Sequence, residues 1–487
     1  MGGGSGDGVR GERRQPSAGL AILLLLLVLQ LALADAHLSS KAPGFGGDEP
    51  SYVGKALELR EHGGFPRLPE DSRGKPFPND FWGNSDWRPV GYPLFLAAVG
   101  AEGFEPRATR LRVTVLQFGG VAIALLLSYG LAIRWLGVGG RASLLVAAGL
   151  GLQPWTFAYV GLIGPESLTM TMTWMGTVAL AAASASRGRT AVLAVATGSF
   201  ALTGAGLLRP ESLALAPPLV VLALWLGPRQ KAELLTKAAA AAIAFLSIIS
   251  LQVAYRWQLS GRVEIFGPAR FFNGGFLRWI NTWVNTEKGA YDGLAYRIGS
   301  GTVRIDELPS RAFLGTWDRE QVSSTLERIR AEGGYTREVD QSFAAIAAWK
   351  TSNAPLSCFV IPRVARTFQL WLNLESNSQL LEALSRAPRV VSRGVIAAAT
   401  ASRIVVLGLF FVAVGVSLQA ARLPREIGQA LLLLSIAYVL LRTLLVGAAL
   451  GWAVARYMHP AWMPMLWCAI VGALEVSRAW TSRVAGS

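Results

Sequence analysis

Short motifs that combine acidic residues, arginine and proline recur beside apolar segments of this sequence. A carboxylate can take up a proton from a reacting hydroxyl, and a guanidinium can hold an oxyanion through two parallel hydrogen bonds. Where the apolar segments cross a membrane, such ionisable groups are costly and are usually kept for a pathway or a site. The candidate motifs are Asp48-Glu49, Pro165-Glu166, Arg209-Pro210-Glu211 and Arg456-Tyr457.

Each motif also has a purely structural interpretation. Asp48 could cap a short amphipathic helix that has Pro50 in its first turn and ends at Gly63-Gly64. The glutamates that follow proline could complement a helix dipole, and the arginines could reach lipid headgroups from helix ends. Capping does not explain why acids and arginines from four separate loops fall on one side of a membrane. A functional site explains this shared side of the membrane, whereas capping does not.

The elements that must position these residues are apolar helices. The chain has 487 residues, of which 52% are hydrophobic and 16% charged. Leucine, alanine, valine and glycine recur in blocks of about 20 residues, the length that spans a hydrocarbon core. The sequence predicts an all-α polytopic membrane protein, a bundle of about ten transmembrane helices, at 19–36, 111–135, 142–162, 167–186, 190–208, 211–227, 238–257, 395–418, 428–448 and 459–477.

The charge distribution predicts the orientation of this bundle. Lysine and arginine number 46 against 31 acidic residues, a net charge of +15. With the N-terminus in the cytosol, every predicted inner segment is basic, as the positive-inside rule requires, so the charge needs no nucleic-acid partner. The candidate motifs then lie on the extracytoplasmic face. The inner basic residues are Arg10, Arg13, Arg14, Arg134, Arg141, Arg187, Arg189, Arg229, Lys231, Lys237, Arg422, Arg425, Arg478 and Arg483.

Composition divides the chain into four parts. Residues 1–18 are predicted to be a disordered cytosolic tail, and 19–257 an N-terminal transmembrane module with the first outer loop at 37–108. Residues 258–394 are predicted to form an outer, aromatic-rich loop region, and 395–487 the C-terminal transmembrane helices. The loop 37–108 is expected to carry a juxtamembrane helix.

The outer region 258–394 contains helical patterns of its own. Val322, Leu326 and Ile329 form an apolar stripe that ends at Gly333-Gly334, and a second helix is predicted over 338–352. The segment PLSCFVIPRVARTFQLWLNLE is apolar but is interrupted by proline and charge. It is predicted to lie at the interface or to pack on the bundle rather than to span the membrane.

The first apolar segment has two interpretations. Its basic start, apolar run and Ala-Asp-Ala ending are typical of a cleavable signal peptide. A retained helix is favoured, because it would anchor Asp48 and Glu49 at the membrane. Cleavage would not change the side on which the later loops lie, so the charge distribution does not decide between them.

The motifs, in this order, resemble a known family. Asp48-Glu49 with Tyr52 and Ala56, Arg88-Pro89-Val90-Gly91-Tyr92-Pro93-Leu94-Phe95, Pro165-Glu166, Arg209-Pro210-Glu211 and Arg456-Tyr457-x-x-Pro460 are similar to motifs of GT-C integral-membrane glycosyltransferases. The protein mannosyltransferases and the aminoarabinose and galacturonic-acid transferases are the most similar group. The resemblance covers about residues 19–260 and the last span. Ala455 stands where many relatives have an acid, and the segment 258–394 has no match.

The resemblance implies a reaction and roles for the matching residues. Such an enzyme moves a hexose or pentose from a polyprenyl-phosphate donor, of the dolichyl-phosphate-mannose type, to an acceptor on the extracytoplasmic or lumenal face. Asp48 would be the general base of an inverting transfer, with Glu166 second, and Glu49 would orient the acceptor or hold a divalent cation. The donor phosphate would be bound by Arg209, Arg456 and Tyr457. The sugar or acceptor loop would include Arg88, Tyr92, Trp279 and Trp283, although the tryptophans fit an interfacial aromatic belt equally well.

The implied partners are membrane lipids, the lipid-linked sugar donor and a lipid, glycan or protein acceptor, with no nucleic acid. Cofactor need is open: a divalent cation is compatible with the acids, but no metal motif is present. The cysteines Cys358 and Cys468 and the histidines His37, His62 and His459 are too few and too scattered for a disulfide framework or a zinc site.

Two other functions remain open. A lipid or small-molecule transporter or flippase would have similar helices but should show inverted repeats and matching broken helices. A non-catalytic protein with a GT-C fold is the third interpretation, and Ala455 keeps it open. The high content of arginine, alanine and glycine and the lack of paired outer cysteines favour a bacterial inner membrane over the endoplasmic reticulum.

Overall fold

The structure is a computed structural model, in which the described residues form helices joined by turns and loops, with no strand among them. The predicted all-α class is confirmed. The described residues are 15–39, 49–63, 89–100, 105–153, 156–157, 159–227, 230–260, 263, 265, 274–284, 297–298, 301–372, 389–419, 427–450 and 455–486.

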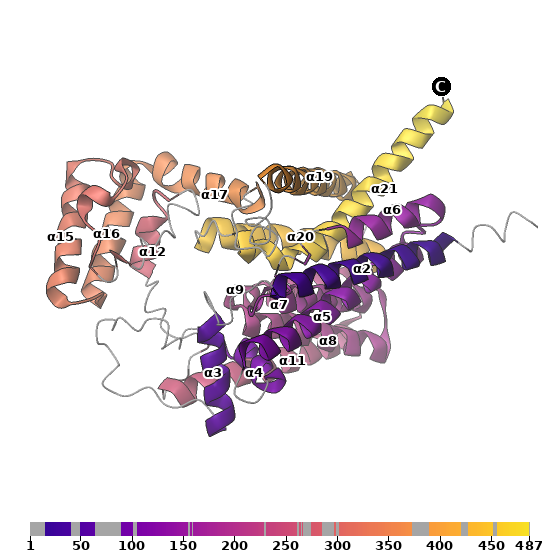
Figure 1. Ribbon diagram of the computed structural model, residues 1–487, viewed down its shortest axis with the longest axis horizontal. Coiled ribbons are helices and arrows are strands. Elements are labelled where there is room, and N and C mark those ends of the chain that lie inside the picture. The colour runs from indigo at the N-terminus through magenta and orange to yellow at the C-terminus, as the bar shows by residue number, and fades with distance from the viewer. Residues whose placement is uncertain are drawn as a thin grey trace, which may run out of the picture.

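A bundle of apolar helices forms the larger part of the molecule (Figure 1). Among the described residues, seven helical segments are long and apolar enough to cross a membrane, which makes the chain an integral membrane protein: Pro106–Trp135, Glu166–Ala185, Gly188–Leu208, Lys231–Gln258, Ile396–Leu418, Ile427–Gly447 and Tyr457–Arg483. The helices are α2 (Gln15–Ser39), α5 (Pro106–Trp135), α6 (Gly140–Gly151), α7 (Glu166–Ala185), α8 (Gly188–Leu208), α9 (Pro210–Leu213), α10 (Ala216–Leu226), α11 (Lys231–Ser260), α19 (Arg389–Gln419), α20 (Ile427–Thr443) and α21 (Trp462–Gly486).

The other three predicted spans are shorter apolar helices, at 17–32, 140–151 and 210–226. The predicted span 142–162 is helical only to Gly151, because proline at position 154 disfavours helical backbone at Gln153. The predicted span 211–227 is divided into α9 and α10 around Ala214 and Leu215, just before a pair of prolines. Residues 15–18 belong to α2, whereas the sequence predicted them to lie in the tail.

Small residues let the bundle helices approach closely. A Cβ atom at Gly176 of α7 would lie 2.8 Å from Leu202, and one at Gly198 of α8 would lie 2.8 Å from Leu180. Van der Waals contact of this kind is the main attraction between helices in lipid. The first helix, α2, shares this packing, since a Cβ at Gly151 would lie 2.8 Å from Leu26.

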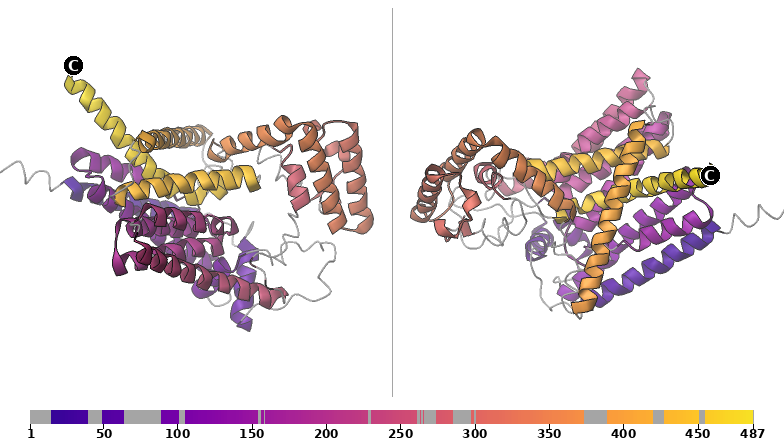
Figure 2. Two further views of the ribbon diagram at one scale, coloured as in Figure 1. Left: turned by 180° about the vertical axis from the view of Figure 1, so that it is seen from behind. Right: turned by 90° about the horizontal axis from the view of Figure 1, so that it is seen from above.

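A second, smaller helical unit, called the outer unit here, comprises α12 (Gly274–Ile280), α15 (Thr316–Glu332) and α16 (Arg337–Asn353). It lies beyond one end of the bundle in all three views (Figures 1 and 2). The two helices predicted here are confirmed, and Gly333 ends α15 with a φ of 70°, where glycine has no Cβ penalty. The stripe Val322, Leu326 and Ile329 is buried in a hydrophobic core separate from that of the bundle.

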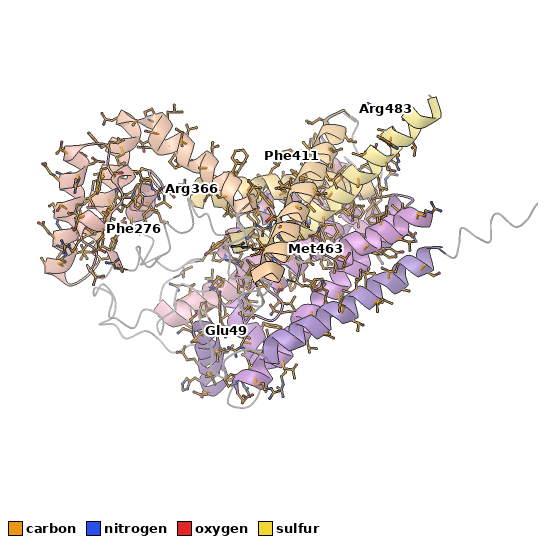
Figure 3. All side chains as sticks on the ribbon, turned by 45° about the horizontal axis from the view of Figure 1, so that its top comes forward. Glu49, Phe276, Arg366, Phe411, Met463 and Arg483 are labelled. Carbon is orange, nitrogen blue, oxygen red and sulfur yellow. The ribbon has the colours of Figure 1, made fainter. Side chains whose placement is uncertain are left out.

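Arg366 of α17 (Ile361–Leu372) joins the outer unit to the bundle. Its guanidinium donates to the carbonyls of Asn281 at 3.2 Å and Val284 at 2.6 Å, just after α12. It also donates to Gly447 at 3.3 Å, in the π-helical segment η6 (Leu444–Leu450) that continues α20. In Figure 3, Phe276 marks the outer unit and Arg366 lies between it and the bundle. The prediction that this segment packs on the bundle is confirmed.

Two helices of the first loop lie at the same end of the bundle. The predicted juxtamembrane helix is α3 (Glu49–His62), which ends before Gly63 and runs across the direction of the bundle helices (Figure 1). The second, α4 (Gly91–Val99), packs against α3 and α8. A Cβ at Gly91 would lie 2.6 Å from the carbonyl oxygen of Leu207, so only glycine fits there.

Candidate functional site

Arg209 lies at the centre of a buried chain of ion pairs. It is the residue between α8 and α9, and its Nη1 lies 2.8 Å from Oε1 of Glu166, the first residue of α7. Its Nε lies 2.7 Å from Oε1 of Glu211 in α9. All three side chains are less than 8% exposed. The short loop with proline at position 210 turns the chain so that both acids reach one guanidinium.

Arg442, near the end of α20, extends this chain. Its Nη2 lies 3.3 Å from Oε1 of Glu211, and its Nη1 donates to the hydroxyls of Ser212 at 3.0 Å and Tyr438 at 3.2 Å. Its Nε donates to the carbonyl oxygen of Tyr457 at 2.6 Å. The side chain is fully buried, so all of its charge is balanced by protein groups.

Tyr457 connects the last membrane segment to the same chain. It lies in η7 (Ala455–Ala461), the 3-10 turn that leads into α21. Its ring covers the guanidinium of Arg209, with 4.2 Å between the guanidinium carbon and the ring centroid. A planar cation stacked on a ring keeps its in-plane N–H groups free for acceptors.

A second ion pair joins α3 to α5. Oε2 of Glu49 lies 2.6 Å from Nη2 of Arg110, and both side chains are less than 9% exposed. Oε1 of Glu49 accepts a hydrogen bond from the backbone N–H of Ile163 at 3.3 Å. Since Ile163 lies three residues before Glu166, the two ion-pair groups are neighbours.

Tyr92 of α4 lies between the two groups. Its side chain is fully buried, and its ring meets that of Tyr52 edge-on at 5.0 Å between centroids. Burial raises the pKa of the Tyr92 hydroxyl well above its usual value, and the negative charges of Glu166 and Glu49 raise it further. The hydroxyl therefore keeps its proton.

These residues all belong to one end of the bundle. The N-termini of α5 and α7 and the C-termini of α8 and α20 meet there, on the side of α3 and the outer unit (Figure 1). We call the arrangement the acid–arginine cluster: Glu49, Arg110, Glu166, Arg209, Glu211 and Arg442. Its three carboxylates and three guanidiniums sum to zero charge, which limits the cost of burying them.

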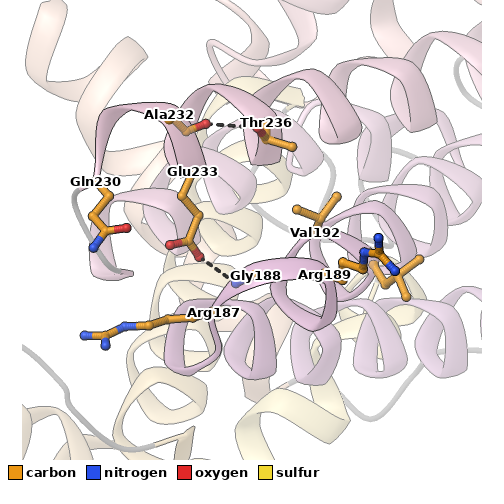
Figure 4. A pocket seen from close by; sticks show the side chains of 9 residues that line it. Arg187, Gly188, Arg189, Val192, Gln230, Ala232, Glu233 and Thr236 are labelled. Atoms are coloured by element: carbon orange, nitrogen blue, oxygen red, sulfur yellow. Dashed lines mark hydrogen bonds between the residues drawn. The ribbon is translucent and has the colours of Figure 1, made fainter.

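The opposite end of the bundle is basic and contains a pocket of 710 Å³ (Figure 4). There, a carboxylate oxygen of Glu233 accepts from the backbone N–H of Gly188 at 3.3 Å. The 21 residues of α8 separate Gly188 from the acid–arginine cluster by about 30 Å. The pocket is therefore not part of the cluster. Its lining residues are Arg187, Gly188, Arg189, Val192, Leu193, Gln230, Ala232, Glu233 and Thr236.

The remaining predicted site residues lie outside the described residues, are described only in part, or lie away from the cluster. Asp48 and Arg88 lie outside the described residues, and Arg456 is described only in its backbone, within η7. Trp279 and Trp283 are 0% and 3% exposed in the core of the outer unit. Protein neighbours cover their ring faces, so in this structure neither ring is available to a sugar.

Sequence reasoning missed Arg110 and gave Arg442 no functional role. Arg442 lies within a predicted span and pairs inside the bundle with Glu211. Arg110 had a detectable signal: the run RATRLR puts arginines on a predicted outer segment, against the positive-inside rule. Basic residues that break this rule need another explanation, such as a buried acid partner.

The cluster can bind an anion by exchange. Carboxylate and phosphate both accept two parallel hydrogen bonds from a guanidinium, so an incoming phosphate can replace Glu166 or Glu211 on Arg209. Within the described ranges, no group of three or more histidine, cysteine, aspartate or glutamate side chains is arranged to hold a metal ion. The described acids of the cluster are instead held by arginines.

Comparison with known proteins gives little further guidance. No protein-family model matches the chain, and no curated protein matches it. Among solved structures, the chain is similar to the archaeal oligosaccharyltransferase AglB from Archaeoglobus fulgidus, in complex with an inhibitory peptide and a dolichol-phosphate. The TM-score is 0.48 at 12% identity, over 96% of this chain and 51% of that chain. The functional argument therefore depends on the residues of this chain alone.

Proposed function

We propose that this protein is a membrane glycosyltransferase that moves a sugar from a polyprenyl-phosphate donor to a lipid, glycan or protein acceptor. The observation that carries the proposal is the convergence of acids and arginines from α3, α5, α7, α9 and α20 at one buried end of a membrane bundle. A transporter needs such groups near the middle of the membrane and along a path. A cluster at one end suits chemistry on a substrate that stays anchored in the bilayer.

The donor phosphate would bind at Arg209 and Arg442, with Arg456 and the Tyr457 ring beside them. Stacking of Tyr457 on Arg209 supports this assignment, because it fixes the plane in which the guanidinium donates. A phosphate that replaces one carboxylate on Arg209 would leave that acid free to contact the sugar or the acceptor. The greasy polyprenyl chain would remain in the bilayer beside the helices.

The general base would be Asp48. It directly precedes Glu49, a residue of the acid–arginine cluster, in the sequence. Glu49, Glu166 and Glu211 each bind a guanidinium, so their carboxylates are already engaged in ion pairs. In the reaction, the acceptor oxygen attacks the anomeric carbon, the bond from that carbon to the phosphate oxygen breaks, and the phosphate leaves with the electron pair. The acceptor proton moves late to Asp48, so a weak base suffices, and the anomeric configuration inverts.

The site would face the extracytoplasmic side. The opposite end carries Arg187, Arg189 and Lys231, and the positive-inside rule assigns such an end to the cytosol. The bacterial inner membrane is the proposed location. The first loop 37–108 would then be the catalytic loop, with the outer unit beside it.

The test is a transfer assay with purified full-length protein in lipid nanodiscs and radiolabelled polyprenyl-phosphate sugars. Asp48→Asn should abolish transfer while binding of the donor survives. The matched control is Glu233→Gln, which changes an acid at the opposite end and should leave transfer unchanged. Near-normal turnover in Asp48→Asn would reject the base assignment. Movement of the lipid across the bilayer without any glycosylated product would instead identify a transporter.

A further inference from the structure

His459 is a buried side chain next to the acid–arginine cluster that the proposed mechanism does not use. It lies in η7, two residues after Tyr457, and is 1% exposed. Its ring meets the ring of Tyr159 edge-on, at 4.7 Å between centroids. In the part of the chain that the structure describes, neither Nδ1 nor Nε2 has a hydrogen-bond partner.

Two unpaired nitrogens on one buried ring are unusual. A neutral imidazole has one N–H donor and one lone-pair acceptor, and leaving a buried polar group unpaired costs roughly 1–3 kcal/mol. Phenylalanine would fill a similar space without that cost. His459 differs from the other described residues with an unpaired buried atom, such as Trp467 at its Nε1, in that both polar atoms of one ring are unpaired. A ligand that accepts from one of them would explain this.

The surroundings of His459 favour an anionic ligand. The positive charges of Arg209, Arg442 and Arg403 all act on the ring. The geometry of η7 explains this, since the ring of Tyr457 stacks on Arg209 and its carbonyl accepts from Arg442. Arg403 of α19 lies over the ring of Trp462, three residues after His459, at 5.6 Å. A hydrogen-bond donor that is buried among guanidiniums matches a phosphate better than a neutral sugar hydroxyl.

We propose that His459 donates a hydrogen bond to a phosphate oxygen of the lipid-linked donor and binds this phosphate together with Arg209 and Arg442. The inference rests on the proposed function and adds a residue to its donor site. His459 is a binding residue in this scheme, because it contacts the leaving phosphate and not the acceptor.

The proposal predicts that affinity and stability change in opposite directions. His459→Phe should weaken binding of a short-chain polyprenyl phosphate about tenfold, which is 1.4 kcal/mol. The same variant should unfold at an equal or higher temperature, because it removes two unpaired buried atoms. His459→Gln keeps polar atoms near the position of Nε2. Its affinity for polyprenyl phosphate should lie between that of the wild type and that of His459→Phe. A residue that serves only packing would lose stability without losing affinity.

The experiment is calorimetric titration of the full-length protein in nanodiscs, with thermal unfolding followed on the same samples. Polyprenyl phosphate carries no sugar, so a loss of affinity places the contact at the phosphate. Ser199→Ala is the matched control: it removes a different buried, unpaired polar atom, the Ser199 hydroxyl in the middle of α8, and should leave affinity unchanged. Phosphatidic acid distinguishes the donor from an ordinary bilayer headgroup and should show no His459 effect.

Four outcomes would contradict or limit the proposal. Equal affinity of wild type and His459→Phe for polyprenyl phosphate would overturn it, as would a lower unfolding temperature with unchanged affinity. An equal effect on phosphatidic acid would reassign the site to a bilayer lipid and overturn the donor assignment. If wild type does not bind polyprenyl phosphate at all, the proposed function fails as well, which separates the two failures.

Discussion

The bundle and the outer unit use their buried and half-buried acids in different ways. In the outer unit, Asp340 accepts from the backbone N–H groups of Gly275 and Phe276, both at 3.1 Å, and from the Tyr335 hydroxyl at 2.7 Å. Asp318 accepts from the backbone N–H groups of Leu314 at 2.8 Å and Gly315 at 2.9 Å. Most contacts of these acids hold main chain in place, although Asp318 also pairs with the buried Lys350 of α16 at 3.8 Å.

In the bundle, the buried acids bind side chains from other helices. Glu166 binds Arg209 across 43 residues of sequence, and Glu49 binds Arg110 across 61 residues. A backbone N–H cannot be given up without opening the fold, whereas a guanidinium can exchange one oxyanion for another. The comparison teaches that burial of an acid does not identify a site, but the kind of partner does.

The largest expected effect comes from the centre of the cluster. Arg209→Met leaves Glu166 buried without its guanidinium and should lower the free energy of unfolding by about 3–5 kcal/mol, together with loss of transfer activity. Thermal unfolding in nanodiscs measures the first effect. The double variant Arg209→Met with Glu166→Gln should recover part of the stability, because it removes the unpaired charge. Equal instability of the single and double variants would contradict this account of the ion pairs.

An intermediate effect is expected in the outer unit. Asp340→Ala removes the acceptor of two backbone N–H groups and one hydroxyl and should destabilise the outer unit by about 3 kcal/mol. Limited proteolysis between α12 and α16 measures this loss. Donor binding should persist at temperatures where the unit is folded. Loss of donor binding by a folded Asp340→Ala protein would show that donor binding depends on the outer unit as well as on the cluster in the bundle.

The smallest effect is expected at the start of α5, where Glu105 is a helix cap exposed to solvent. Its carboxylate accepts from the backbone N–H groups of Arg107 at 3.0 Å and Ala108 at 2.6 Å, and these bonds lower its pKa below the usual 4.5. The stabilisation is therefore present above pH 4.5 and is lost as the pH falls through the lowered pKa. Glu105→Ala should slightly lower the unfolding temperature at pH 7, with activity unchanged. The difference from wild type should shrink in acid, and a difference independent of pH would rule out the cap.

Glu105 and Glu166 show how far a local pattern can be interpreted. Both glutamates lie at helix starts next to proline, and both could complement a helix dipole. Glu105 does cap its helix, whereas Glu166 binds Arg209. The sequence could not separate these cases, because the partner of Glu166 lies 43 residues away. The sequence could not assign Trp279 and Trp283 either, because a run of aromatic residues has the same pattern whether the rings face a ligand or a hydrophobic core.

The sequence by itself determined that the chain is a helical membrane protein, where its apolar helices lie and which end of the bundle is basic. These properties follow from the transfer of each segment from water to lipid, which adds up along the chain and needs no partner. Only the tertiary structure decided that Arg110 and Arg442 join the cluster, that the aromatic residues of α12 are core and that His459 is left unpaired. Ion pairs and hydrogen bonds act over a few ångströms, so they depend on which helices meet and not on any local pattern.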